Sequence, residues 1–140
     1  MPDRTLTIPQ RCIDEMVAHA RQEAPNECCG MLAGKGDAIS NVYHATNLDK
    51  SPVKYTIDPK DMIRIDSEAA KAGLDVIAFY HSHTFTEAYP SVTDVKLVPP
   101  NDLFDYLYVI VSLANQSSPS IRAFHIVNRD VREVPVAVPA

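Results

Sequence analysis

The stretch from His81 to Asp94 contains side chains that commonly bind metal ions. In an extended backbone, residues two apart point to the same face, so His81 and His83 can offer two imidazoles to one ion while Ser82 turns away. Asp94, on the next element, can supply a third ligand. Two histidines and a carboxylate leave the fourth tetrahedral position of a zinc ion free for water, as in catalytic sites. We therefore predict a metal site with one open position.

Each of these residues also has a purely structural interpretation. A His-x-His pair on a strand is often a polar rim above a core, and Ser91-x-x-Asp94 after a proline is typical of a capping box at a helix start. The two interpretations of Asp94 are compatible, because a helix starting at Ser91 places Asp94 in its first turn, close to the histidines. Pro99 and Pro100 limit that helix to about two turns.

Glu27 is the candidate for proton transfer. A water molecule that attacks a carbonyl next to a metal needs a base to accept its proton and later deliver it to the leaving nitrogen. By spacing alone Glu27 would be a solvated residue between a helix and a strand, since nothing local connects it to His81.

The complete set resembles the signature of the JAMM metalloproteases, also called MPN-plus. That signature is a distant glutamate followed by His-x-His, seven residues, serine, two residues and aspartate, and it is filled here by Glu27, His81, His83, Ser91 and Asp94. Residues 25–34 also look like the family's glutamate segment, and the resemblance in element order covers most of the chain. The family's usual proline after the second histidine is Thr84 here, so we expect the 84–90 loop to differ in shape.

The resemblance implies a JAMM/MPN (cytidine-deaminase-like) architecture and one zinc ion with a bound water. It implies that His81, His83 and Asp94 hold the ion, that Glu27 acts as base and then acid, and that Ser91 helps to hold the oxyanion, where a hydroxyl donor is useful. Stand-alone bacterial members, which this compact chain resembles, include enzymes acting on small ubiquitin-like or sulfur-carrier proteins. The predicted activity is thus a zinc-dependent peptidase or isopeptidase cleaving an amide bond at the extended C-terminal tail of such a protein.

Three alternatives compete with this hypothesis. A non-catalytic interaction module of the same fold would be marked by loss of a ligand, and none is lost. A cysteine hydrolase would use Cys28 or Cys29, but neighbouring residues of a strand face opposite sides and small buried cysteines are usually core residues. A zinc nucleoside deaminase needs His-x-Glu and Cys-x-x-Cys motifs, which the sequence lacks. Surface or satisfied polar positions are expected for the remaining candidates, His19, His44, Glu87 and His125.

The apolar patterning predicts the elements that position these residues. The expected fold is an α/β sandwich, a mixed β-sheet with two principal helices. Continuous apolar runs over 75–83 and 106–113 indicate central strands covered on both faces. The expected helices are 9–23 and a second one that starts at Pro59, is capped by Asp58 and is ended by Gly73. The other expected strands are 27–34, 38–46, 55–57 and 120–128. Prolines confine 131–140 to a sheet edge or an extended end.

Length and composition limit the function classes. A chain of 140 residues has the size of one domain, so we expect a single domain over 1–140. The formal charge of -5 without a Lys/Arg cluster excludes nucleic acid or an acidic membrane as the main partner. The absence of a signal-peptide core and the odd count of three cysteines, expected to be reduced, predict a cytoplasmic protein. The oligomeric state stays open, a homodimer included.

Overall fold

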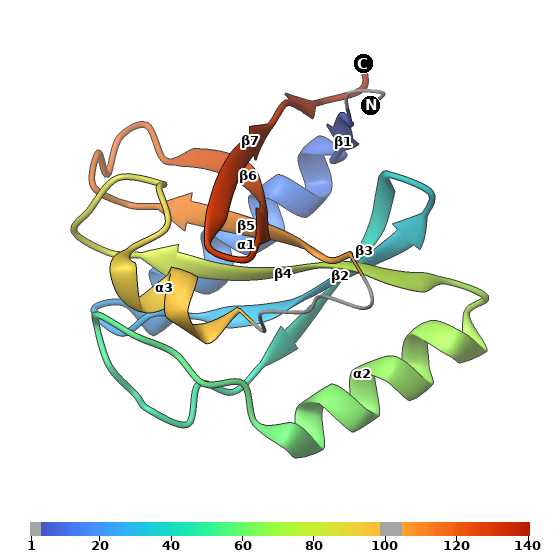
Figure 1. Cartoon of the computed structure of the whole chain (residues 1–140), viewed down its shortest axis with the longest axis horizontal. Coiled ribbons are helices and arrows are strands. Elements are labelled where there is room, and N and C mark those ends of the chain that lie inside the picture. Colours follow the sequence, from blue (N-terminus) through green and yellow to red (C-terminus); the bar gives the residue numbers. More distant parts are fainter. Residues whose placement is uncertain (1–3, 99–104) are drawn as a thin grey trace.

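The computed structural model describes residues 4–98 and 105–140, which form a mixed sheet flanked by helices (Figure 1). The helices are α1 (Gln10–Glu23), α2 (Pro59–Lys71) and α3 (Val92–Leu97). The strands are β1 (Leu6–Thr7), β2 (Cys29–Lys35), β3 (Ala38–Ala45), β4 (Asp75–His83), β5 (Leu107–Ser112), β6 (Ser120–Val127), β7 (Asp130–Val134) and β8 (Val136–Ala137). They form one sheet in the order β7-β6-β5-β4-β2-β3-β1-β8. This architecture confirms the predicted α/β class.

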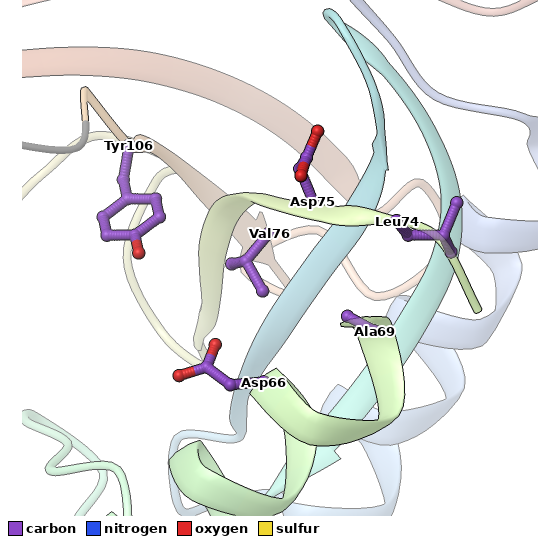
Figure 2. A pocket seen from close by; sticks show the side chains of 6 residues that line it. All are labelled: Asp66, Ala69, Leu74, Asp75, Val76 and Tyr106. Atoms are coloured by element: carbon purple, nitrogen blue, oxygen red, sulfur yellow. The ribbon is translucent and has the colours of Figure 1, made fainter. Parts of the chain in front are cut away.

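β4 is an inner strand of the sheet, and its two ends have different surroundings. It pairs antiparallel with β2 and parallel with β5. Its first residues, Asp75 and Val76, line a pocket of about 310 Å³ together with Asp66 of α2 and Tyr106 (Figure 2). Its last residues are the candidate metal ligands, so the pocket and the histidines lie at opposite ends of β4.

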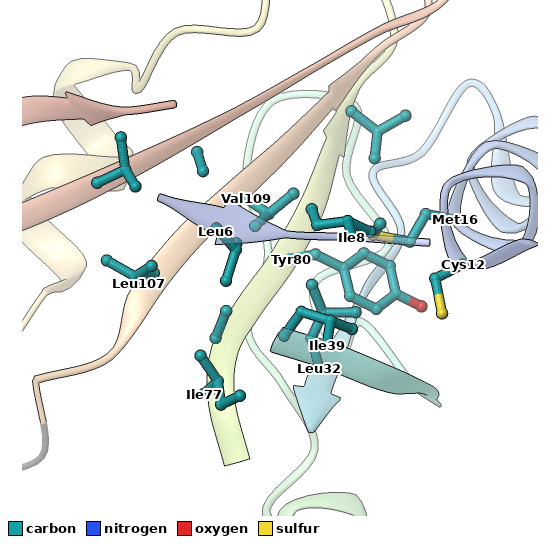
Figure 3. Close-up of a cluster of buried hydrophobic side chains, with 14 of the residues drawn as sticks. Leu6, Ile8, Cys12, Met16, Leu32, Ile39, Ile77, Tyr80, Leu107 and Val109 are labelled. Atoms are coloured by element: carbon teal, nitrogen blue, oxygen red, sulfur yellow. The ribbon is translucent and has the colours of Figure 1, made fainter. Parts of the chain in front are cut away.

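A cluster of buried apolar side chains holds α1 against one face of the sheet (Figure 3). Cys12 and Met16 from α1 pack there with Leu32 of β2 and Tyr80 of β4. Each large apolar side chain removed from water contributes about 1.5–3 kcal/mol. A second cluster on the opposite face joins the segment before α3 to β5 and β6. Since both faces are covered, the central strands predicted from continuous apolar runs are confirmed.

Most of the predicted elements are present, with small shifts at their ends. Both principal helices form, Asp58 caps α2 by accepting from Lys60 N–H at 2.9 Å, and Gly73 adopts a positive φ beyond the helix end. The edge assignment of the last residues is also confirmed, because β7 and β8 are the outermost strands. None of the helices in the described residues is long and apolar enough to cross a membrane.

Two local expectations need correction. Residues 55–57 are not a strand; Ile57 makes a single isolated bridge with Asn47, because the intervening loop bonds mainly to itself. β1, which the sequence did not predict, pairs in parallel with β8 and with β3, and two residues are too few to show a periodicity. Pro99 and Pro100, expected to end the helix after Ser91, lie outside the described residues.

His19 of α1 gives a stability prediction. Its Nδ1 lies 2.8 Å from the Tyr80 hydroxyl and its ring stacks on His44 with centroids 3.9 Å apart. Burial, helped by His44, lowers the pKa of His19 from 6.5 to about 4. The unfolded chain therefore binds a proton that the folded protein resists, so stability is full above pH 6.5 and is lost as the pH falls toward 4.

We expect the free energy of unfolding to be lower by roughly 2 kcal/mol at pH 4.5 than at pH 7 on account of His19. Urea unfolding at both pH values measures this. A His19→Gln variant should show a weaker pH dependence than wild type. Equal pH dependence in wild type and His19→Gln would contradict the assignment.

Candidate metal centre

Strand alternation places the two histidines on one face at the end of β4. Both are buried, at 2% and 4% exposure for His81 and His83. Ser82 points to the other face, where its Oγ accepts from the Cys28 main-chain N–H at 2.8 Å. The predicted common direction of the imidazoles is confirmed, and the serine between them anchors the neighbouring segment.

The side chains of His81, His83 and Asp94 converge on one point. The two Nε2 atoms are 3.2 Å apart, and each lies 3.0 Å from Asp94 Oδ2. A tetrahedral zinc ion with ligand distances of 2.0–2.2 Å separates its ligand atoms by about 3.3 Å. Among the described residues, these three side chains form the cluster of histidine, cysteine or acidic residues whose ligand atoms lie close enough together to hold one metal ion.

The hydrogen bonds around this point leave a place for a positive charge. His83 Nδ1 lies 2.8 Å from the Glu87 carbonyl oxygen, which can only accept, so this nitrogen carries the proton. When His83 is neutral, as a metal ligand must be, its Nε2 lone pair faces the Asp94 carboxylate, and these two acceptors repel unless a proton or a metal ion lies between them. Within the described residues, the buried Asp94 Oδ1 and His81 Nδ1 lack a hydrogen-bond partner. The donor set therefore fits a bound metal ion.

The electrostatics of the three residues follow from their mutual contacts. Burial lowers the pKa of His81, whereas at His83 the hydrogen bonds to Asp94 and the Glu87 carbonyl outweigh burial and raise the pKa. At Asp94 burial is outweighed by hydrogen bonds from both histidines, which lower the pKa far below its usual range. Asp94 is therefore an anion, the state that binds a metal.

Asp94 is held in place by the start of α3. Ser91 Oγ accepts from Asp94 N–H at 3.0 Å, and Asp94 Oδ2 accepts from Ser91 N–H at 2.9 Å, so the predicted capping box is confirmed. The same Oδ2 atom contacts both histidines. The cap uses a lone pair of the Ser91 hydroxyl and leaves its proton for another acceptor.

Glu27 reaches the site through the pairing of β2 with β4. Cys29 lies opposite His81 in antiparallel register, and continuing this register places Glu27 opposite His83 on the same face. Glu27 is 3% exposed, and burial, aided by Asp94 and opposed by His83, raises its pKa to about 8. A carboxyl group with a pKa in this range can both accept and release a proton near neutral pH.

The 84–90 loop, where the sequence departs from the family pattern, is tied to the glutamate segment. The Thr84 hydroxyl donates to the Pro25 carbonyl oxygen at 2.9 Å. A proline at this position has no hydroxyl and could not form this bond. Thr84 therefore connects the residue after the second histidine to a residue two positions before Glu27.

Replacing Thr84 with Val should lower the free energy of unfolding by about 1 kcal/mol, the usual net value of such a hydrogen bond, and should leave metal binding intact. Chemical denaturation and metal analysis measure the two effects. Thr86→Val is the matched control, since Thr86 is exposed and offers its carbonyl, not its hydroxyl, to Ser112. Equal stability of Thr84→Val and wild type would show that the bond contributes nothing.

The structure also shows contacts that sequence reasoning missed. The Tyr55 ring stacks on the His81 ring with centroids 4.4 Å apart and an interplanar angle of 22°. Glu87 contributes its main-chain carbonyl to His83, so its residue type carried no signal. Burial raises the pKa values of Cys28 and Cys29 to about 12, which keeps them as unreactive thiols and disfavours the cysteine hydrolase.

The chain is similar to known proteins over nearly its whole length. The family model described as prokaryotic homologs of the JAB domain matches residues 9–127. The CysO-cysteine peptidase of Mycobacterium tuberculosis is 38% identical over 135 residues, covering 95% of this chain and 90% of the relative. The desampylase of Haloferax volcanii is 35% identical over 101 residues, covering 67% of this chain and 73% of the relative.

The fold is also similar to solved structures. The solution structure of a Desulfitobacterium hafniense protein superposes with a TM-score of 0.84 at 35% identity, covering 96% of this chain and 92% of that one. The mixed sheet with flanking helices is therefore shared with an experimentally determined relative.

Proposed function

The chain belongs to the family of prokaryotic homologs of the JAB domain, and we propose that it is a zinc-dependent peptidase or isopeptidase. Its substrate in this proposal is the C-terminal tail of a small ubiquitin-like or sulfur-carrier protein, where it hydrolyses an amide bond. The observation that carries the proposal is the convergence of His81, His83 and Asp94 beside a buried glutamate of raised pKa. The peptidase and desampylase names of similar proteins support the substrate class.

In this proposal His81, His83 and Asp94 hold the ion through Nε2, Nε2 and Oδ2. Two imidazoles and one carboxylate suit zinc, although the same ligands accept other divalent metals. When bound, the ion supplies a water of lowered pKa and polarises the scissile carbonyl. Asp94 is fixed by the α3 cap and His83 by the Glu87 carbonyl, so these two ligands need little reorganisation to bind.

Glu27 moves the proton in the proposed reaction. Its carboxylate accepts a proton from the attacking water and then delivers it to the leaving nitrogen, so the group ends as it began. Its burial keeps bulk water from competing for the proton, and its pKa of about 8 allows both transfers near neutral pH.

Ser91 has the further role of donating its hydroxyl proton to the oxygen of the scissile carbonyl as negative charge develops there. The cap bond orients the hydroxyl, because the lone pair that accepts from Asp94 N–H determines where the O–H can point. We further propose that the reaction takes place in the cytoplasm, in keeping with the free thiols of Cys12, Cys28 and Cys29.

The test is to incubate the zinc-loaded protein with ubiquitin-like and sulfur-carrier proteins extended at their C-termini and to weigh the products by mass spectrometry. Cleavage at the tail of at least one carrier is the expected result. Zinc near one equivalent per chain by elemental analysis is expected in parallel. Zinc without any cleavage would overturn the substrate class, and a protein with no affinity for metal would favour the non-catalytic interaction module.

A further inference from the structure

Residues 47–57 form a loop beside the metal centre, and the buried side chain of Asn47 closes it. The Asn47 amide uses both donor and both acceptor positions. Its Nδ2 donates to the carbonyl oxygens of Lys54 and Glu27, each at 3.1 Å. Its Oδ1 accepts from the main-chain N–H groups of Asp49 and Thr56, each at 3.0 Å. One side chain therefore joins the loop to the residue proposed as the base.

The same loop also binds the main-chain N–H of Glu27. The Glu27 N–H donates to the Ser51 carbonyl oxygen at 2.8 Å, while the Glu27 carbonyl accepts from Asn47. β2 begins only at Cys29, so Glu27 lies before the regular ladder that positions the histidines. The main chain of Glu27 is thus held by the loop on both sides.

Asn47 also holds the main chain on both sides of Tyr55, whose ring lies against His81. Tyr55, whose ring stacks on His81, lies between Lys54 and Thr56, two of the three loop residues whose main chains bind the Asn47 amide. The position of this ring therefore depends on the same side chain as the position of Glu27.

We propose that Asn47 is a positioning residue, which sets the Glu27 carboxylate relative to the metal ligands through the 47–57 loop. The expected effect on catalysis rests on the proposed function, whereas the expected effect on the position of Glu27 does not. A shift of about 1 Å in a reacting group costs about 10²-fold in rate, so a hydrogen bond that fixes Glu27 has a large kinetic effect without contacting substrate.

Asn47→Asp is the first test variant. It keeps an acceptor for the Asp49 and Thr56 amides but replaces the donor with a carboxylate oxygen facing two carbonyls. Amide hydrogen exchange by NMR on the zinc-loaded protein reports how often the hydrogen bond of the Glu27 amide opens. We expect the Glu27 amide to exchange at least about tenfold faster, because its Ser51 bond loosens, while the Cys28 amide, bound to Ser82, stays protected.

Kinetics on a cleaved carrier give the second readout. For Asn47→Asp we expect kcat to fall by about 10²-fold with KM and zinc content nearly unchanged, since the substitution replaces none of the proposed metal-binding side chains. Asn115→Asp is the matched control, because Asn115 also caps a turn through Oδ1, accepting from the Ser117 N–H at 3.2 Å, but lies in a different loop. It should match wild type in both readouts.

The outcomes separate the two proposals. Unchanged protection of the Glu27 amide, or normal kcat despite lost protection, would overturn the role of Asn47. If wild type cleaves no carrier, the proposed function fails, and hydrogen exchange still decides whether Asn47 holds Glu27. Should Asn47→Asp not fold, Asn47→Ser, which is neutral and too short to reach the Glu27 carbonyl, replaces it in the same measurements.

Discussion

Replacing Glu27 with Gln is expected to reduce turnover by about 10³-fold while zinc stays bound, because an amide has the shape of the carboxyl group but cannot accept the proton. Glu27 is buried and is not part of the His81, His83 and Asp94 cluster that could hold a metal ion, so elemental analysis of the variant should match wild type. Steady-state kinetics on a cleaved carrier measure the loss. Glu23→Gln, an exposed glutamate at the end of α1, is the control. A fully active Glu27→Gln protein would eliminate the proposed mechanism.

Glu27→Gln is expected to increase the stability of the protein although it reduces turnover. The folded pKa of Glu27, about 8, lies above its unfolded value of 4.5, so the folded protein holds a proton that the unfolded chain releases. Stability is therefore lost as pH rises from 4.5 to 8. In the metal-free protein at pH 7, Glu27→Gln should raise the free energy of unfolding by roughly 3 kcal/mol, measured by urea denaturation in chelator. A destabilised variant would contradict the raised pKa.

The second large effect is expected for Asp94→Asn. The amide oxygen can still accept from the Ser91 N–H, so the α3 cap is kept, but the negative charge between the two histidines is removed. We expect zinc affinity to fall by more than about 10²-fold, and activity to fall with it. Loss of a residue that only supports a metal ligand lowers affinity by about 10²-fold at most, so a larger loss identifies a ligand. Competition with a chromophoric chelator measures the affinity.

A matched control separates the ligand role of Asp94 from its helix cap. Asp58 caps α2 through its side chain and belongs to no cluster of ligands among the described residues. Asp58→Asn should therefore leave zinc affinity unchanged, with stability altered by no more than about 1 kcal/mol. Wild-type zinc affinity in Asp94→Asn would exclude Asp94 as a ligand.

Parts of the site that depend on neighbouring residues were predictable from the sequence. The common face of His81 and His83 follows from the two-residue period of a strand, and the position of Asp94 follows from a cap that joins residues three positions apart. The apolar run before the histidines likewise indicated an inner strand, which β4 is. The strand alternation and the helix cap are local, because each acts between residues two or three positions apart.

Other parts depended on contacts between distant segments. Glu27 comes beside His83 because β2 and β4 pair in one antiparallel register, and a slip by one residue would turn Glu27 to the other face. The resemblance to a known signature pointed to Glu27, but its burial and raised pKa appear only in the folded chain.

The sequence by itself determined the types of the candidate site residues, the strand and helix that carry three of them, and the α/β class. Tertiary structure alone decided where Glu27 sits, that Thr84 ties the 84–90 loop to Pro25, and that Asn47 and Tyr55 belong to the site. The reason is physical: periodicity and capping act over a few bonds, whereas strand register and loop closure depend on which distant surfaces pack together, and side-chain spacing carries no record of that choice.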